Sequence, residues 1–256
     1  MTDSEIIRYM DDGVYFYLDF FADAKHMERI DTGFYRYMRP LPGEQGISFV
    51  YYIRLEQLPK GQQLEKIAEI KRFGTHTWWP LLTSDELYRL IHGRDREQAP
   101  LDPPDGEELY MAVTSEGQIP DVPLPGDTAI QRVRNEETFA VWAGAVNDWL
   151  HGGNQYVHPQ NHYSDCATGK IRCYICYKDK HPVSVCSIMD NGGICSLEFV
   201  ATHPDFRRQG FAKSTCAFAM KAAFHDGANI ITLRADNPGT RELYTSLGFK
   251  IYNYAI

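Results

Sequence analysis

Long hydrophobic runs are missing from this chain of 256 residues. No stretch approaches the roughly 18 consecutive apolar residues of a membrane-spanning helix, so neither such a helix nor a membrane partner is expected. The N-terminus reads MTDSEIIRYMDD, which is acidic and lacks the positively charged region of a secretory signal. The six cysteines all lie in the second half. They are too sparse for a disulfide-stapled secreted domain, which predicts reduced thiols in a cytoplasmic protein.

Positive charge is also scarce. The net charge of −8 argues against a nucleic-acid-binding protein, because such proteins carry basic patches that neutralise phosphates. The deficit is confined to one half of the chain. Residues 1–127 have a net charge of −10, whereas residues 128–256 have a net charge of +2. We therefore expect any anionic ligand to bind the second half.

Proline is unevenly distributed along the chain. Six of the 14 prolines fall within residues 98–127, where each fixes φ and keeps the preceding residue out of the helical region. This segment indicates a boundary between two units. We predict an N-terminal unit of unknown role over residues 1–118, a Pro-rich linker over 119–127 and a C-terminal domain over 128–256.

The N-terminal unit is predicted to be α+β. Helical spacing of apolar residues, strand-forming runs and turn signals define its elements. Ser84 is the expected N-cap of its last helix. Helices are expected within 5–21, 64–72 and 84–92, and strands at 33–38, 47–55 and 108–113.

The C-terminal domain shows a clearer order of elements: β, α, a loop-rich stretch, then β, β, β, α, β, α, β. A strand at 129–133 precedes an amphipathic helix at 136–150, whose apolar residues recur mainly at spacings of three and four. The stretch 151–169 is expected to be rich in loops. The later elements are expected at 171–178, 183–189 and 194–202 (strands), 210–224 (helix), 230–235 (strand), 238–247 (helix) and 249–254 (strand).

The strongest chemical signal is LEFVATHPDFRRQGFA, residues 197–212. A strand ends at Thr202, and Arg207-x-x-Gly210-x-Ala212 then begins a helix. The first N–H groups of a helix have no intrahelical acceptor and carry the positive end of its dipole. Small residues at positions 210 and 212 let a phosphate reach these groups, so the segment predicts a phosphate-binding helix start.

In this order of elements the C-terminal domain resembles the GNAT superfamily of acyl-CoA-dependent N-acetyltransferases. The resemblance rests on the strand 194–202, RRQGFA at 207–212, the Asn at 237 and LYTSLGF at 243–249. It covers roughly residues 128–256, and no such motif stands in the first half. The resemblance implies a mixed sheet with flanking helices, with acetyl-CoA as cosubstrate.

The resemblance also implies roles for individual residues. The end of the strand would hold the pantetheine arm and the helix start would hold the pyrophosphate. Tyr244 would protonate the departing thiolate, since a phenol can act as a general acid as the thioester breaks. Asn237 is equally suited to cap the next helix, and Tyr244 to pack in it. The implied cosubstrate-binding residues are Phe199, Val200, Ala201, Thr202, Arg207, Arg208, Gln209, Gly210, Phe211, Ala212 and Asn237.

An amine acceptor must lose a proton, and Glu198 is the only carboxylate on the strand 194–202. Strand alternation places Glu198 on the face of Ser196, Val200 and Thr202. A carboxylate there can act as a general base, directly or through water. A structural hydrogen bond in the sheet is the alternative.

Candidates for binding the acceptor lie in the stretch 151–169, where the superfamily places its acceptor-binding helix and loop. The predicted acceptor-binding residues are His158, His162 and Tyr163, and an ordinary loop residue is the alternative for each. The two histidines lack the second ligand pair of a metal site, so no metal is expected. In the first unit, the Trp78–Trp79 pair is a candidate for the facing wall of an acceptor site, or for buried aromatics.

These features predict an N-acetyltransferase that moves the acetyl group of acetyl-CoA to a primary amine of a small molecule, by direct attack in a ternary complex. The alternatives are an acyl-CoA-binding sensor without turnover and a protein-lysine acetyltransferase. The presence of both Glu198 and Tyr244 favours the enzyme. The expected partners are acetyl-CoA and an amine acceptor, without nucleic acid, in a monomer or homodimer.

Overall fold

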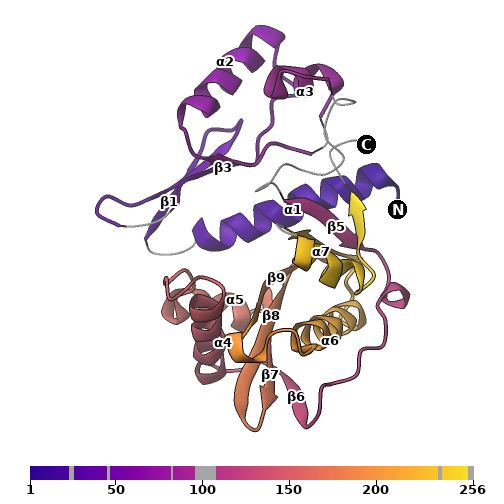
Figure 1. The fold of residues 1–256 in the computed structure, drawn as a ribbon. Helices are drawn as coiled ribbons and strands as arrows, with labels where there is room; N and C mark the ends of the chain where they lie inside the picture. Colours follow the sequence, from indigo (N-terminus) through magenta and orange to yellow (C-terminus); the bar gives the residue numbers. More distant parts are fainter. Residues whose placement is uncertain (23–25, 45–46, 82, 96–107, 236–237, 253–256) are drawn as a thin grey trace.

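Two sheets with flanking helices form the described part of the chain, as the computed structural model shows (Figure 1). The larger sheet has seven strands and the smaller has four. This mixed sheet with flanking helices, joined to a second α+β unit, confirms the predicted fold class. None of the described helices has the length and hydrophobicity needed to cross a membrane. The structure describes residues 1–22, 26–44, 47–81, 83–95, 108–235 and 238–252.

The seven-stranded sheet is the scaffold on which the candidate site is built. In spatial order its strands are β11 (Lys250–Tyr252), β5 (Leu109–Val113), β10 (Ile230–Ala235), β9 (Ile194–Thr202), β8 (His181–Asn191), β7 (Ile171–Lys178) and β6 (Thr128–Arg132). β9 and β10 run parallel, whereas the other neighbours are antiparallel. The observed bounds of β7, β9 and β10 are those that the sequence predicts.

Helices cover both faces of this sheet (Figure 1). They are α1 (Asp3–Ala22), α4 (Glu136–Trp149), α5 (Pro159–Ala167), α6 (Phe211–His225) and α7 (Pro238–Thr245). α6 packs against β8 and β9 in an apolar cluster that includes Leu197, Cys216 and Met220. α4 contacts the same strands through a second cluster, in which Phe139 and Trp142 are fully buried.

The smaller sheet belongs to the N-terminal unit, which Figure 1 shows above α1. Its elements are β1 (Met27–Asp31), β2 (Arg36–Pro40), β3 (Phe49–Tyr51), α2 (Lys60–Arg72), β4 (His76–Thr77) and α3 (Asp85–His92). Ser84 caps α3 as predicted, since its side chain accepts a hydrogen bond from the Leu87 N–H at 3.2 Å. β1 was not predicted, because its sequence, MERID, is mostly charged and its order comes from pairing with β2.

β5 joins the larger sheet although it lies within the predicted N-terminal unit. It pairs antiparallel with both β10 and β11, and all five of its residues are buried. Leu109 and Met111 pack in the cluster beneath α6, whereas Tyr110 and Ala112 pack in a cluster with α1. A strand buried on both faces and paired on both edges cannot leave its sheet without exposing backbone and apolar groups. The boundary at 119–127 stays a prediction. Two elements that precede it in the chain belong with the larger sheet: β5 is one of its strands, and α1 packs against it.

A β-bulge interrupts β9 next to the predicted base. The register between β8 and β9 shifts at this point, and Phe199 has a φ of 54°. Because a bulge adds a residue to one strand, it disturbs the alternation of the side chains that follow. Val200 packs against the cluster beneath α6, which contains Leu197. The prediction that Val200 shares the face of Glu198 was therefore wrong.

The stretch 151–169, expected to be rich in loops, contains the helix α5. Its sequence, PQNHYSDCA, has little apolar periodicity, and its buried position is filled by His162. Pro159 occupies the first helical position, where its missing N–H breaks no intrahelical bond. Tertiary packing against α4 and β7, rather than local pattern, therefore orders this helix.

Candidate active site

α6 begins with backbone N–H groups that lack an intrahelical partner. Gly210 is the N-cap, with a φ of 89°, and no side chain caps the helix. The first backbone bond runs from the Ser214 N–H to the Gly210 carbonyl at 3.0 Å, which leaves the N–H groups of residues 211–213 for an external acceptor. Glycine adopts this left-handed conformation without the strain that a side chain would add. The helix start therefore fits a phosphate group, as its sequence predicts.

The loop before α6 is held in place by Arg207. Its Nε donates to the Thr202 carbonyl at 3.2 Å and its Nη2 to the Trp149 carbonyl at 3.3 Å. The guanidinium thereby ties the end of β9 to the end of α4. Arg208, the next residue of the motif, is exposed beside the helix start.

β9 and β10 separate at the middle of the sheet. Their parallel pairing runs from Ile194–Ile230 to Ser196–Thr232 and goes no further, although both strands continue. Over residues 197–202 the edge of β9 is therefore not paired with β10. This gap leads towards the start of α6, and it is where the resemblance places the pantetheine arm.

Glu198 lies in this gap within a cluster of charged and aromatic groups. Its side chain is 11% exposed, and its Oε2 is 3.6 Å from Nη2 of Arg234 on β10. Nη1 of Arg234 also contacts Oε2 of Glu108 at 3.1 Å. The guanidinium carbon of Arg234 lies 4.6 Å from the ring centre of Tyr17 on α1. The buried guanidinium of Arg234 therefore forms ion pairs with two carboxyl groups and a cation–π contact with one aromatic ring.

This cluster raises the pKa of Glu198 to about 7. Burial is the largest cause, since it disfavours the charged form; the neighbouring Arg234 lowers the pKa and Glu108 raises it. A carboxyl group with a pKa near the working pH is suited to taking and releasing protons. The sequence identified Glu198 but missed Arg234, Glu108 and Tyr17. Arg234 is the one charged residue of β10, IITLRA, and this is the signal that could have identified it.

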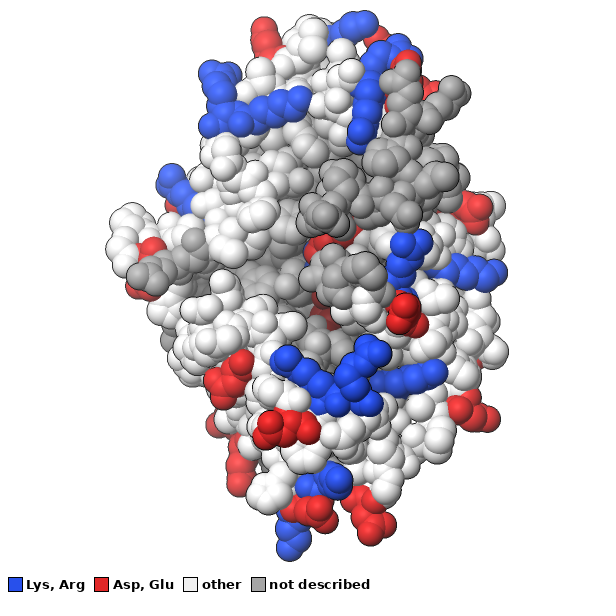
Figure 2. All heavy atoms as spheres, in the orientation of Figure 1, with Lys and Arg blue, Asp and Glu red and all other residues white. Residues whose placement is uncertain are grey.

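A cavity of about 690 Å³ lies beside this cluster, between the N-terminal unit and the loop before α5. Figure 2 shows the surface hollowed at this level of the molecule, above a group of Lys and Arg side chains. From the first half of the chain the lining includes Tyr17, Phe21, Met27, Phe49 and Trp78. From the second half it includes His151, Tyr156, His158 and Arg234. Trp78 and the segment 151–158 thus form facing walls, an arrangement that the sequence predicts.

The predicted acceptor-binding residues do not all reach this cavity. His158 lines it, and its pKa is lowered by burial and by the nearby His26. His162 is fully buried, with its ring stacked 4.3 Å from that of Phe20. Tyr163 lines a different, smaller cavity near β6 and packs against Phe139.

Trp79 is also outside the cavity lining, since it packs in the core of the N-terminal unit. Tyr244 lies in the last turn of α7, is 8% exposed and packs 5.9 Å from the ring of Phe249. Asn237 falls outside the described residues. The roles implied for Tyr244 and Asn237 stay predictions.

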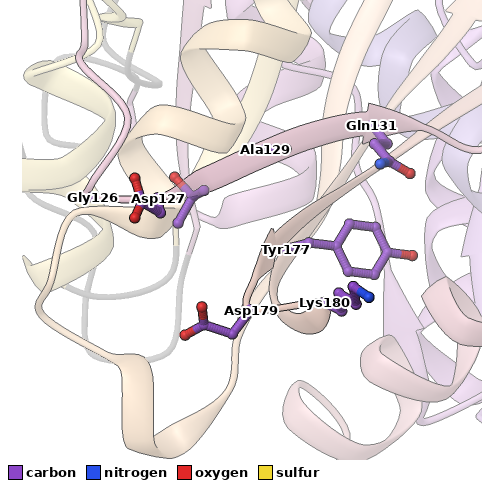
Figure 3. Close-up of a pocket in the computed structure, with 8 residues that line it drawn as sticks. Gly126, Asp127, Ala129, Gln131, Tyr177, Asp179 and Lys180 are labelled. Carbon is purple, nitrogen blue, oxygen red and sulfur yellow. The ribbon is translucent and has the colours of Figure 1, made fainter.

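A second cavity, of about 540 Å³, lies at the free edge of the larger sheet. Figure 3 shows Asp127 and Asp179 on one side of it, with Gln131, Tyr177 and Lys180 on the other. These side chains surround an open space and do not converge on one point. None of the residues predicted for catalysis or acceptor binding lines it, so the cavity beside Glu198 is the candidate active site.

Comparisons with known proteins agree with this geometry. The acetyltransferase (GNAT) family matches residues 135–249, whereas no curated protein sequence gives a significant match. A GCN5-related N-acetyltransferase from Kribbella flavida has a similar structure, with a TM-score of 0.61 at 14% identity, over 93% of this chain and 91% of that one. That likeness spans both units and shows a shared fold.

Two further solved structures resemble the chain over most of its length. A putative GNAT acetyltransferase from Novosphingobium aromaticivorans gives a TM-score of 0.44 at 14% identity, over 90% of this chain and 85% of that one. A protein of unknown function from Staphylococcus epidermidis gives 0.48 at 15% identity, over 91% and 93%. The motif, the splayed strands and the matched family together confirm the resemblance: the C-terminal half of this chain is a domain of the GNAT acetyltransferase superfamily.

Proposed function

We propose that this protein is an N-acetyltransferase that transfers an acetyl group from acetyl-CoA to a primary amine of a small molecule. The observation that carries the proposal is Glu198, a buried carboxyl group with a pKa of about 7, placed where β9 and β10 separate. Its strand leads to the start of α6, and its partner Arg234 lines a cavity large enough for a small acceptor. Both reactants can therefore meet beside one base.

Each residue has a definite task in this reaction. Acetyl-CoA supplies the acetyl group as a thioester. The N–H groups at the start of α6 hold its phosphates, and the unpaired edge of β9 holds its arm. Glu198 takes the proton of the amine, directly or through water, which frees the nitrogen lone pair for attack on the thioester carbonyl. Tyr244 returns a proton to the sulfur as the C–S bond breaks.

The cavity favours a small acceptor over a protein lysine. Its lining comes from both units of the chain, so elements of the N-terminal unit cover the side from which a protein substrate would approach. Its volume of about 690 Å³ falls within the range of small-molecule sites, roughly 300–1,000 Å³. A sensor that only bound acyl-CoA would need neither this cavity nor a base poised near neutral pH.

The proposal is tested by a screen of primary amines with acetyl-CoA, in which free thiol release reports turnover. In the Glu198→Gln variant, turnover is expected to fall about 10²–10⁴-fold, the usual contribution of a general base, with acetyl-CoA affinity unchanged by calorimetry. Glu137→Gln, an exposed carboxylate at the start of α4, is the matched control. Full turnover in Glu198→Gln, under conditions where chemistry limits the rate, would contradict the proposal.

A further inference from the structure

The cavity beside Glu198 has an apolar wall supplied by the N-terminal unit. This wall consists of Leu18, Phe21, Met27, Ile47, Phe49 and Trp78. The rings of Phe49 and Trp78 lie 5.2 Å apart, at an angle of 59°. Such a surface gains most from a ligand that brings apolar or aromatic area of its own, since both then leave water.

The amide groups on the opposite wall are already engaged by their own loop. Nδ2 of Asn154 donates to the His151 carbonyl at 2.9 Å, and Nε2 of Gln155 donates to the Gly153 carbonyl at 3.2 Å. Oε1 of Gln155 accepts from Asn147 at 3.2 Å. Among the described lining residues, Nε2 of His151 is the one buried side-chain polar atom without a partner. It offers a ligand a single hydrogen bond, whereas a ligand rich in hydroxyl groups has several to satisfy, and a buried polar group without a partner is costly.

The remaining end of the cavity carries more acid than base. Among the described residues, Glu108 and Arg234 line this end, and Glu198, which is not itself a lining residue, is the second carboxyl group paired with Arg234. Burial lowers the pKa of both His151 and His158, which disfavours the charged form of each ring. An ammonium group is attracted to such an end. A carboxylate or phosphate on the acceptor would meet no uncommitted Lys or Arg among the described lining residues, and it would stand near two acids.

We propose that the acceptor is a monoamine with an aromatic or other apolar body and no anionic group. Its amine points to Glu198 and Glu108, and its body packs against Trp78 and Phe49. This inference rests on the proposed function, because it names the substrate class of the same site. The N-terminal unit is thereby the part of the molecule that selects the acceptor.

The first experiment compares three amines as acceptors for the full-length chain at saturating acetyl-CoA. 2-Phenylethylamine has the proposed features, L-phenylalanine adds a carboxylate to the same body, and glucosamine replaces that body with hydroxyl groups. We expect kcat/KM to be about 10- to 100-fold lower for each of the latter two, the effect of one group buried without a partner. Equal or higher kcat/KM with L-phenylalanine or glucosamine overturns the inference and leaves the proposed function standing.

A binding measurement separates the inference from the proposed function. 2-Phenylethylamine is titrated calorimetrically into the chain saturated with CoA, which carries no acetyl group and permits no turnover. Binding that is tighter than for the other two amines supports the inference, even where acetyl-CoA gives no thiol release and the proposed function fails. Absence of binding by 2-phenylethylamine in the millimolar range overturns the inference.

A matched pair of variants tests whether the apolar wall recognises the apolar part of the acceptor. Trp78→Ala is expected to lower the ratio of kcat/KM for 2-phenylethylamine over that for ethylamine about tenfold or more, because only the larger amine reaches the aromatic wall. Phe73→Ala removes an exposed aromatic of the same unit, outside the cavity, and should leave the ratio unchanged. A merely structural role of Trp78 would lower both rates equally, and that result contradicts the assignment of the wall.

Discussion

The proposed cosubstrate side and the proposed acceptor side of this molecule are built in opposite ways. The cosubstrate side is one continuous segment, in which β9, a short loop and α6 follow each other along the chain. The acceptor side collects groups from α1, the smaller sheet, β10 and the loop before α5. The difference teaches that a helix start can be specified locally, because it uses backbone N–H groups, whereas a cavity of side chains depends on long-range packing.

The largest expected effect comes from separating the two halves at the predicted linker. A chain that begins at residue 128 lacks β5, whose five buried residues pair with β10 and β11. At about 1.5–3 kcal/mol for each large apolar side chain, this loss approaches the whole stability of a typical domain, about 5–15 kcal/mol. We expect no cooperative thermal unfolding of this fragment by circular dichroism. A fragment that unfolds cooperatively near the melting temperature of the full chain would show that the cosubstrate side is independent.

Tyr244→Phe tests the cosubstrate side at the leaving group. The change keeps the ring in its buried place and removes only the hydroxyl. We expect turnover to fall about 10²-fold, at the lower end of general acid effects, because a thiolate is already a good leaving group. Stopped-flow thiol release should show the loss, while the melting temperature and acetyl-CoA affinity stay close to those of the parent. An unaffected chemical step would remove Tyr244 from the mechanism.

Gly210→Ala tests the local character of the phosphate site. Gly210 has a φ of 89°, and a side chain in the left-handed region costs about 1–2 kcal/mol. We expect the Kd for acetyl-CoA to rise about tenfold, with kcat at saturation retained. Gly33→Ala, at a φ of 83° with open space around it, carries the same strain far from α6. Equal affinities in the two variants would mean that the helix start does not hold the cosubstrate.

Glu108→Gln tests how much a residue from the first half of the chain changes the pKa of Glu198. Glu198 must be deprotonated to act, so kcat/KM should rise with pH through its pKa of about 7. Glu108 raises that pKa, so its removal lowers the pKa and moves the rise to lower pH, by about one unit for charges a few ångströms apart. The measurement is kcat/KM between pH 5 and 9, with Glu137→Gln as control. If kcat/KM of Glu108→Gln rises over the same pH range as in the parent, Glu108 does not affect the pKa of Glu198.

Local pattern predicted most elements of the C-terminal half and supplied candidates for its chemistry. β7, β9 and β10 have the predicted bounds because buried strands of β-branched and aromatic residues end at clear turn residues. Glu198 was found because it is the only carboxylate on β9. α5 was missed because its order comes from packing, and the face of Val200 was mistaken because a bulge breaks the period of two.

The amino-acid sequence by itself determined the proposed phosphate-binding start of α6, the order of the surrounding elements and the choice of Glu198 as the proposed base, since each depends on residues close together in the chain. Only the tertiary structure decided the pKa of Glu198 and the shape of the acceptor cavity. Both arise because folding brings Tyr17 and Glu108 from the first half to Arg234 on β10. The distances among these groups, and the burial that strengthens their interaction, exist only once α1 and β5 are packed onto the larger sheet.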